Sequence, residues 1–141
     1  MVRRLAALSR EDRFLLVDTV VCTIRVRARM RVRPRSALRR DLKSPEGSPR
    51  PNGISPEKIA WSVNAVRRRC PGGSCLQWAL VARRLLKRHG HHSELRFGVA
   101  RPGGNEFSAH AWVECGGRVV VGNLPDLHTY SVLTEPRTAK A

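Results

Sequence analysis

The chain has 141 residues, with 27 Lys or Arg against 11 Asp or Glu, so its formal net charge is +16. This length suits one domain with a modest core, and the basic excess predicts an acidic partner without naming it. No apolar run reaches the roughly 18 residues of a membrane span, and the N-terminus lacks a signal-peptide cleavage pattern. We therefore expect a cytoplasmic protein whose four cysteines are thiols.

Composition divides the chain into three zones. Residues 1–43 form a basic segment in which Ser9 and Asp12 can cap a helix that is apolar on more than one face, so we expect it to pack on the rest of the chain. Residues 44–56 hold four prolines and two glycines and indicate a linker. Residues 57–141 are expected to form the compact domain.

A helix is expected to begin at Ser55-Pro56, because serine caps helices and proline suits the first helical position. Ile59, Val63 and Val66 then recur at helical spacing and predict one buried face.

A second helix is expected directly after the turn Pro71–Gly73. Ser74 can cap it while Gln77, three residues later, reaches back in a capping box. The apolar pattern continues until Gly90, a typical helix stop. Cys75 therefore falls on the first turn of a buried helix.

The period then changes from helical to alternating, which predicts strands over 95–99, 108–115 and 118–122. A loop is expected over 101–105, and a tight turn at Gly116-Gly117.

The tight turn fixes a register that can be counted. A two-residue turn at Gly116-Gly117 places Trp112 opposite Val121 and His110 opposite Asn123, with directly opposed side chains on the same sheet face. A bulge would shift the partner of His110 by one residue and remove this contact.

These residues suit nucleophilic catalysis. A cysteine at a helix N-terminus lies among free N–H groups at the positive end of the dipole, and both favour the thiolate. His110 is the candidate base, and Asn123 the candidate orienter of its imidazole, as in the Cys-His-Asn arrangement of papain-like peptidases. The N–H groups near Cys75 could hold an oxyanion, with Gln77 as a candidate helper.

The segments GGSCLQWALVARRLLKRHG, LRFGVA and SAHAWVECGGRVVVGN resemble the transglutaminase-like leader peptidase of lasso-peptide gene clusters, in its standalone type without the leader-recognition domain. The resemblance covers roughly residues 57–130. It implies an α+β fold with a Cys-bearing helix on an antiparallel sheet, and a cysteine peptidase that frees a core peptide from its leader. Cys75 and His110 match the family's nucleophile and base. The family's third member is usually an aspartate, so Asp126 is the alternative to Asn123.

The resemblance also implies partners: the leader of a precursor peptide, a small leader-recognition protein and an ATP-dependent lasso macrocyclase. Hydrolysis of this kind needs no cofactor. We expect no metal site, because the cysteines and histidines lack a tidy ligand spacing. Cys22, Cys70 and Cys115 are interpreted as structural.

Two other functions stay open. The chain could be a non-catalytic basic module that binds a peptide or nucleic acid on the same fold, although seven aromatic residues and no nucleic-acid-binding motif disfavour nucleic acid. It could also transfer the acyl group to an amine in place of water.

Overall fold

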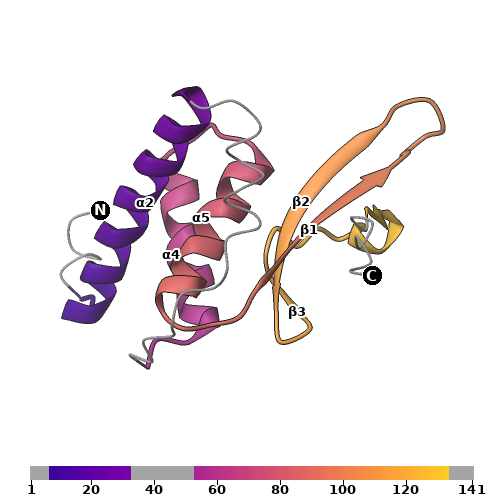
Figure 1. Cartoon of the computed structure of the whole chain (residues 1–141). Coiled ribbons are helices and arrows are strands. Elements are labelled where there is room, and N and C mark those ends of the chain that lie inside the picture. The colour runs from indigo at the N-terminus through magenta and orange to yellow at the C-terminus, as the bar shows by residue number, and fades with distance from the viewer. Residues whose placement is uncertain (1–6, 33–52, 134–141) are drawn as a thin grey trace, which may run out of the picture.

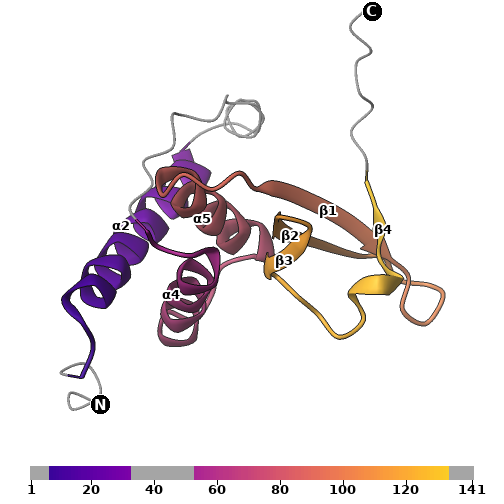
Figure 2. The same ribbon diagram turned by 90° about the horizontal axis from the view of Figure 1, so that it is seen from below.

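The computed structural model describes residues 7–32 and 53–133. In these two stretches three α-helices are followed by an antiparallel sheet, which confirms the predicted α+β fold. The helices gather on one side of the molecule and the strands extend from the other (Figure 1, Figure 2). Residues 33–52, which hold the end of the predicted basic segment and most of the predicted linker, lie outside the described residues.

The helices are α2 (Arg10–Val32), α4 (Pro56–Arg69) and α5 (Cys75–Arg88). The strands are β1 (Glu94–Ala100), β2 (Ser108–Cys115), β3 (Arg118–Val121) and β4 (Ser131–Val132), and a short 3-10 helix, η1 (Leu127–Thr129), precedes β4. No helix in the described residues is long and apolar enough to span a membrane.

Local capping sets where the first two helices begin. The Ser9 hydroxyl accepts from the Asp12 N–H at 3.1 Å, and the Asp12 carboxylate accepts from the Ser9 N–H at 3.3 Å, a reciprocal capping box. The Ser55 hydroxyl accepts from the Lys58 N–H at 3.2 Å, and Pro56 occupies the first helical turn. Both predicted helix starts are confirmed.

Helix α2 is part of the core, as predicted for the N-terminal segment. Leu15, Cys22 and Val26 are at most 3% exposed and share one apolar cluster with residues of α4 and α5. The predicted apolar face of α4 is also confirmed, since Ile59, Val63 and Val66 are buried in the same cluster. The burial of these side chains from water joins the three helices into one unit.

The four strands lie in the order β3-β2-β1-β4, and each neighbouring pair is antiparallel. Ala111 and Val113 of β2 are the residues that enter the helical core. Successive side chains of a strand point to opposite faces. His110 and Trp112 alternate with these two residues, so their side chains leave β2 on the side away from them.

The predicted register of the β2–β3 hairpin is wrong beyond its first two pairs. A bulge inserts Val120 as an extra residue, so that Val121 faces Val113 and not Trp112. A bulge adds one residue to one strand and moves all later pairs by one position. The strand β3 therefore ends at Val121, one residue earlier than predicted.

The sequence did not predict η1 or β4. β4 is only two residues long and pairs with the outer edge of β1, with Val132 opposite Gly98. A strand this short has no visible alternation. It places Tyr130, the residue before it, beside the middle of the sheet.

Candidate active site

Cys75 is the first residue of α5, as predicted. The hydroxyl of Ser74, whose backbone is extended, accepts from the Gln77 N–H at 3.3 Å and caps the helix. Cys75 is half-buried and packs against the core cluster. Its thiol lies at the end of the helix where backbone N–H groups lack partners within the helix, which favours negative charge.

The second half of the predicted capping box is wrong, because the Gln77 side chain makes no bond back to Ser74. Its Oε1 is buried and accepts no hydrogen bond in the described residues. A β-carbon on Gly73 would lie 2.5 Å from this oxygen, and the φ of 93° at Gly73 is in the region that favours glycine. Gln77 is thus held against the loop before Cys75, where it remains the candidate oxyanion helper.

Helix α2 also contacts the loop that precedes Cys75. The Arg27 guanidinium donates to the Gly72 carbonyl at 3.0 Å and lies 5.6 Å from the centre of the Trp78 ring. Sequence reasoning missed this support, because Arg27 is one of many arginines in a basic segment and Gly72 lies far along the chain. The N-terminal helix therefore helps to fix the start of α5.

His110 is held by a backbone group. Its Nε2 lies 2.6 Å from the carbonyl oxygen of Gly122. A carbonyl can only accept, so Nε2 carries the proton and donates it. In the neutral ring the lone pair is then on Nδ1, the atom that can take a proton from a thiol.

Two aromatic rings flank this imidazole. Trp112 stacks on it with centroids 6.1 Å apart, and Tyr130 is tilted against it at 5.9 Å. The Tyr130 hydroxyl and the Ser108 hydroxyl are hydrogen-bonded at 3.0 Å. A β-carbon on Gly98 would lie 2.8 Å from the Trp112 ring and 3.0 Å from Tyr130, so Gly98 makes room for both. Sequence reasoning used Trp112 only in the hairpin register and missed Tyr130.

The predicted pairing of His110 with Asn123 is wrong. The bulge in β3 removes the register on which it rested, and the imidazole bonds to the carbonyl of Gly122. Asp126 precedes η1, and its carbonyl accepts from the Thr129 N–H and hydroxyl. Within the described residues neither Asn123 nor Asp126 is hydrogen-bonded to His110.

Cys75 and His110 are not joined by a hydrogen bond in the described structure. Cys75 packs on the core cluster to which Ala111 belongs, whereas His110, the residue before Ala111, points away from that cluster. The structure thus brings the helix of Cys75 and the strand of His110 together, but it leaves the two reactive atoms apart.

Two of the other cysteines, Cys22 and Cys115, have surroundings unlike that of Cys75. All four cysteines are free thiols. Burial raises the pKa of Cys22, and burial together with nearby Glu57 raises the pKa of Cys115, which makes both thiols poorer nucleophiles at neutral pH. No group of three or more His, Cys, Asp or Glu side chains in the described ranges could hold a metal ion.

The chain matches one known protein family. A family model described as transglutaminase-like superfamily matches residues 20–135, a stretch that includes most of α2, all later elements, Cys75 and His110. Comparisons with curated proteins and with solved structures give no significant match. Because the family model covers most of the sequence, the chain belongs to the transglutaminase-like superfamily.

Proposed function

We propose that the chain is a cysteine peptidase that removes the leader from a ribosomally made lasso-peptide precursor in the cytoplasm. The observation that carries the peptidase assignment is a capped helix beginning at Cys75 beside a strand whose His110 has Nε2 committed to a carbonyl. The leader specificity is supported by the motifs around these two residues, which resemble the lasso-peptide peptidases.

In the proposed reaction, His110 Nδ1 takes the thiol proton as Cys75 Sγ attacks the carbonyl at the leader–core junction. The same imidazole gives that proton to the leaving amine, and an acyl-enzyme remains. Water then adds to the acyl carbon, loses a proton to His110 and releases the leader acid and free thiol. The N–H groups at the start of α5, with Gln77, stabilise the oxyanion.

The Gly122 carbonyl takes the place of the usual side-chain orienter. It fixes the tautomer, as an aspartate would, but carries no full charge to stabilise the imidazolium. The proposal also requires His110 to move toward Cys75 when substrate is bound, because its imidazole leaves β2 on the side away from the core cluster on which Cys75 packs.

The precursor and the recognition protein would come from neighbouring genes, as would the macrocyclase that closes the released core. The test incubates the chain and recognition protein with this precursor and follows the products by mass spectrometry. The wild type and Cys70→Ala, the matched control, should release leader and core, whereas Cys75→Ala should not. Cleavage by Cys75→Ala at the wild-type rate would end the proposal.

The product mass also separates hydrolysis from acyl transfer. A released leader whose mass includes one added water indicates the peptidase. A released leader whose mass includes an added amine indicates a transferase.

One observation favours a second candidate, a non-catalytic basic module that binds a peptide on the same fold. Cys75 and His110 share no hydrogen bond, and His110 leaves β2 on the side away from the helical core. This candidate predicts that the chain binds the precursor and the recognition protein. It also predicts that neither the wild type nor any variant cleaves the precursor.

A further inference from the structure

Helix α2 carries a second apolar face that the fold leaves exposed. Phe14, Val17 and Ile24 are 74%, 61% and 62% exposed, and Val20 and Val21 are each 38% exposed. These positions recur every three or four residues and therefore form one stripe along the helix. The stripe lies opposite the face by which Leu15, Cys22 and Val26 enter the core. A run of exposed apolar side chains of this kind is typical of an interaction surface.

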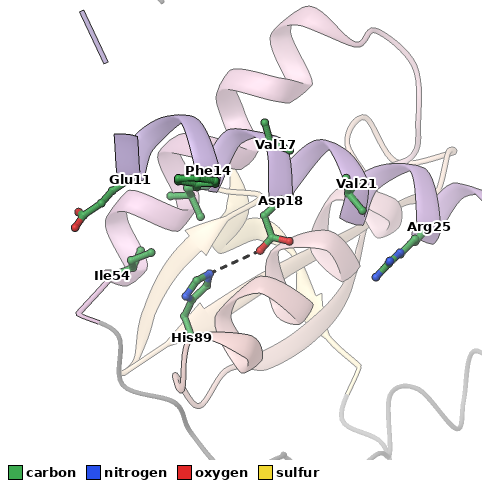
Figure 3. Close-up of a pocket in the computed structure, with 9 residues that line it drawn as sticks. Glu11, Phe14, Val17, Asp18, Val21, Arg25, Ile54 and His89 are labelled. Atoms are coloured by element: carbon green, nitrogen blue, oxygen red, sulfur yellow. Dashed lines mark ion pairs between the residues drawn. The ribbon is translucent and has the colours of Figure 1, made fainter. Parts of the chain in front are cut away.

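A groove accompanies the stripe. Its volume is about 620 Å³, and it is open to solvent between α2 and the residues that precede α4 and follow α5. Phe14, Val17 and Val21 lie along one wall, while Ile54 and His89 lie across from them (Figure 3). Asp18 enters the groove from the helix.

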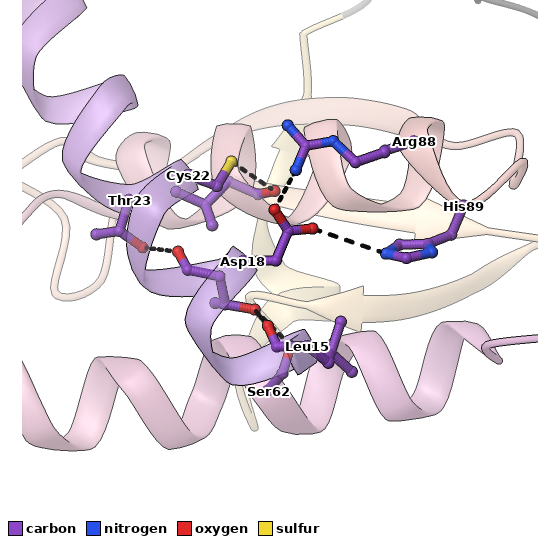
Figure 4. Close-up of polar contacts among 9 residues, drawn as sticks. Leu15, Asp18, Cys22, Thr23, Ser62, Arg88 and His89 are labelled. Carbon is purple, nitrogen blue, oxygen red and sulfur yellow. Dashed lines mark hydrogen bonds and ion pairs between the residues drawn. The ribbon is translucent and has the colours of Figure 1, made fainter. Parts of the chain in front are cut away.

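One of the two acids that line the groove, Asp18, is already compensated within the chain. Asp18 forms an ion pair with Arg88 and lies 4.0 Å from His89 (Figure 4). Asp12, the residue after Glu11, is paired with Lys58 at 2.8 Å. Of the three acids of α2, only Glu11 remains to face a partner.

The charge left on this surface is positive. Helix α2 carries six arginines. Arg10 is exposed before the apolar stripe. Arg25 and Arg31 are exposed after it, in the last turns of α2. Arg25 lines the groove and takes part in no ion pair of the described residues. The stripe is thus bounded by positive charge at both ends, on a chain with a formal charge of +16.

We infer that this face of α2 docks an acidic polypeptide segment with an apolar ridge, bound as an amphipathic helix beside α2. Apolar side chains of the partner fill the groove between Phe14 and Ile54, and its carboxylates meet Arg10 and Arg25. A second copy of the chain fits less well, because two surfaces that each carry excess arginine repel one another. The surface is separate from the candidate active site, so it goes beyond the proposed peptidase function.

The test uses the full chain and a designed peptide of about 18 residues, long enough to match the exposed stripe. The probe has leucines on one helical face and glutamates on the other. One control peptide has the same composition with the leucines scattered, and a second has lysine in place of glutamate. Binding is followed by fluorescence anisotropy at two salt concentrations.

The double variant Phe14→Ser/Val17→Ser should weaken binding by about tenfold or more, because it removes the centre of the apolar contact. Arg25→Glu should weaken it too and reduce its salt dependence. Phe107→Ser is the matched control, since Phe107 is 69% exposed but lies before β2, and it should bind as the wild type does. Thermal unfolding of each variant checks that the fold is intact.

The inference is overturned if the lysine peptide binds as tightly as the glutamate peptide, or if Phe14→Ser/Val17→Ser leaves binding unchanged. It is also overturned if sedimentation shows a wild-type dimer that this double variant dissolves, because a second copy would then be the occupant. Cys75→Ala should bind the probe like the wild type, so the docking surface and the peptidase function can fail independently.

Discussion

His110 donates a hydrogen bond from Nε2 to the carbonyl oxygen of Gly122 over 2.6 Å. A backbone carbonyl cannot be removed by a side-chain substitution, and it holds the ring in one tautomer whatever residues follow it. This bond leaves Nδ1 as the ring atom that can accept a proton, and it makes a main-chain group the orienter of the imidazole.

Asn123→Ala and Asp126→Ala should each keep most of the cleavage activity, because neither side chain holds the imidazole. His110→Ala should lose about 10²-fold or more, the usual contribution of a general base. Initial rates of precursor cleavage compare the three variants. A loss with Asp126→Ala alone would mean that the carboxylate reaches His110 during catalysis and that Gly122 is not the working orienter.

Gly98→Ala should destabilise the fold by about 1–3 kcal/mol, the usual effect of overpacking. The new methyl group would meet Trp112 and Tyr130 within 3.0 Å and push them away from His110. Tyr130→Phe is the matched control, since it keeps the ring beside His110 and loses only the bond to Ser108. Urea unfolding and the pH profile of cleavage are the measurements. If the pH profile of cleavage shifts equally in Gly98→Ala and Tyr130→Phe, the shift comes from the Tyr130 hydroxyl and not from the packing.

The buried hydroxyls of Thr19 and Ser62 join α2 to α4 at 3.0 Å, and neither residue is exposed. Thr19→Val or Ser62→Ala alone should cost about 0.5–1.5 kcal/mol, because the bond between the helices is lost while the hydroxyl that remains still donates to a carbonyl of its own helix. The double variant should cost less than the sum of the two, and a denaturant-based double-mutant cycle measures the difference. Strict additivity would show that the two helices do not share this bond in solution.

His89 is 9% exposed, and burial lowers its pKa, although Asp18 opposes the shift and Arg88 and His91 add to it. A lowered pKa means that the unfolded chain binds a proton first as the pH falls below the ordinary value of about 6.5. Stability from the neutral ring is therefore present above that pH and declines from there down to the lowered pKa. Thermal unfolding between neutral and mildly acidic pH should show this decline, and His89→Gln should reduce it. An equally steep decline in His89→Gln would assign the effect to other groups.

Much of the fold could be predicted because its signals are local. Ser9, Ser55 and Ser74 each cap a helix within three residues of sequence, and Cys75 follows directly from the last of them. The predicted register failed for a different reason. Nothing in a run of valines marks Val120 as the extra residue, yet that single insertion changes the partner of every residue beyond it.

Contacts between distant segments could not be predicted. Tyr130 reaches His110 only because a two-residue strand pairs with β1, and Arg27 reaches Gly72 only because α2 packs against α5. Such contacts depend on tertiary packing, which neither periodicity nor spacing records.

The most direct test of the account is a double-mutant cycle on single-turnover cleavage of the precursor, with Cys75→Ala, His110→Ala and the double variant. Substitutions of residues that act as one catalytic unit have strongly non-additive effects on the rate. If Cys75 and His110 act as a pair, Cys75→Ala abolishes cleavage, His110→Ala nearly does, and the double variant loses nothing further. Wild-type cleavage by His110→Ala would contradict this pairing, because Cys75 would then act without the imidazole.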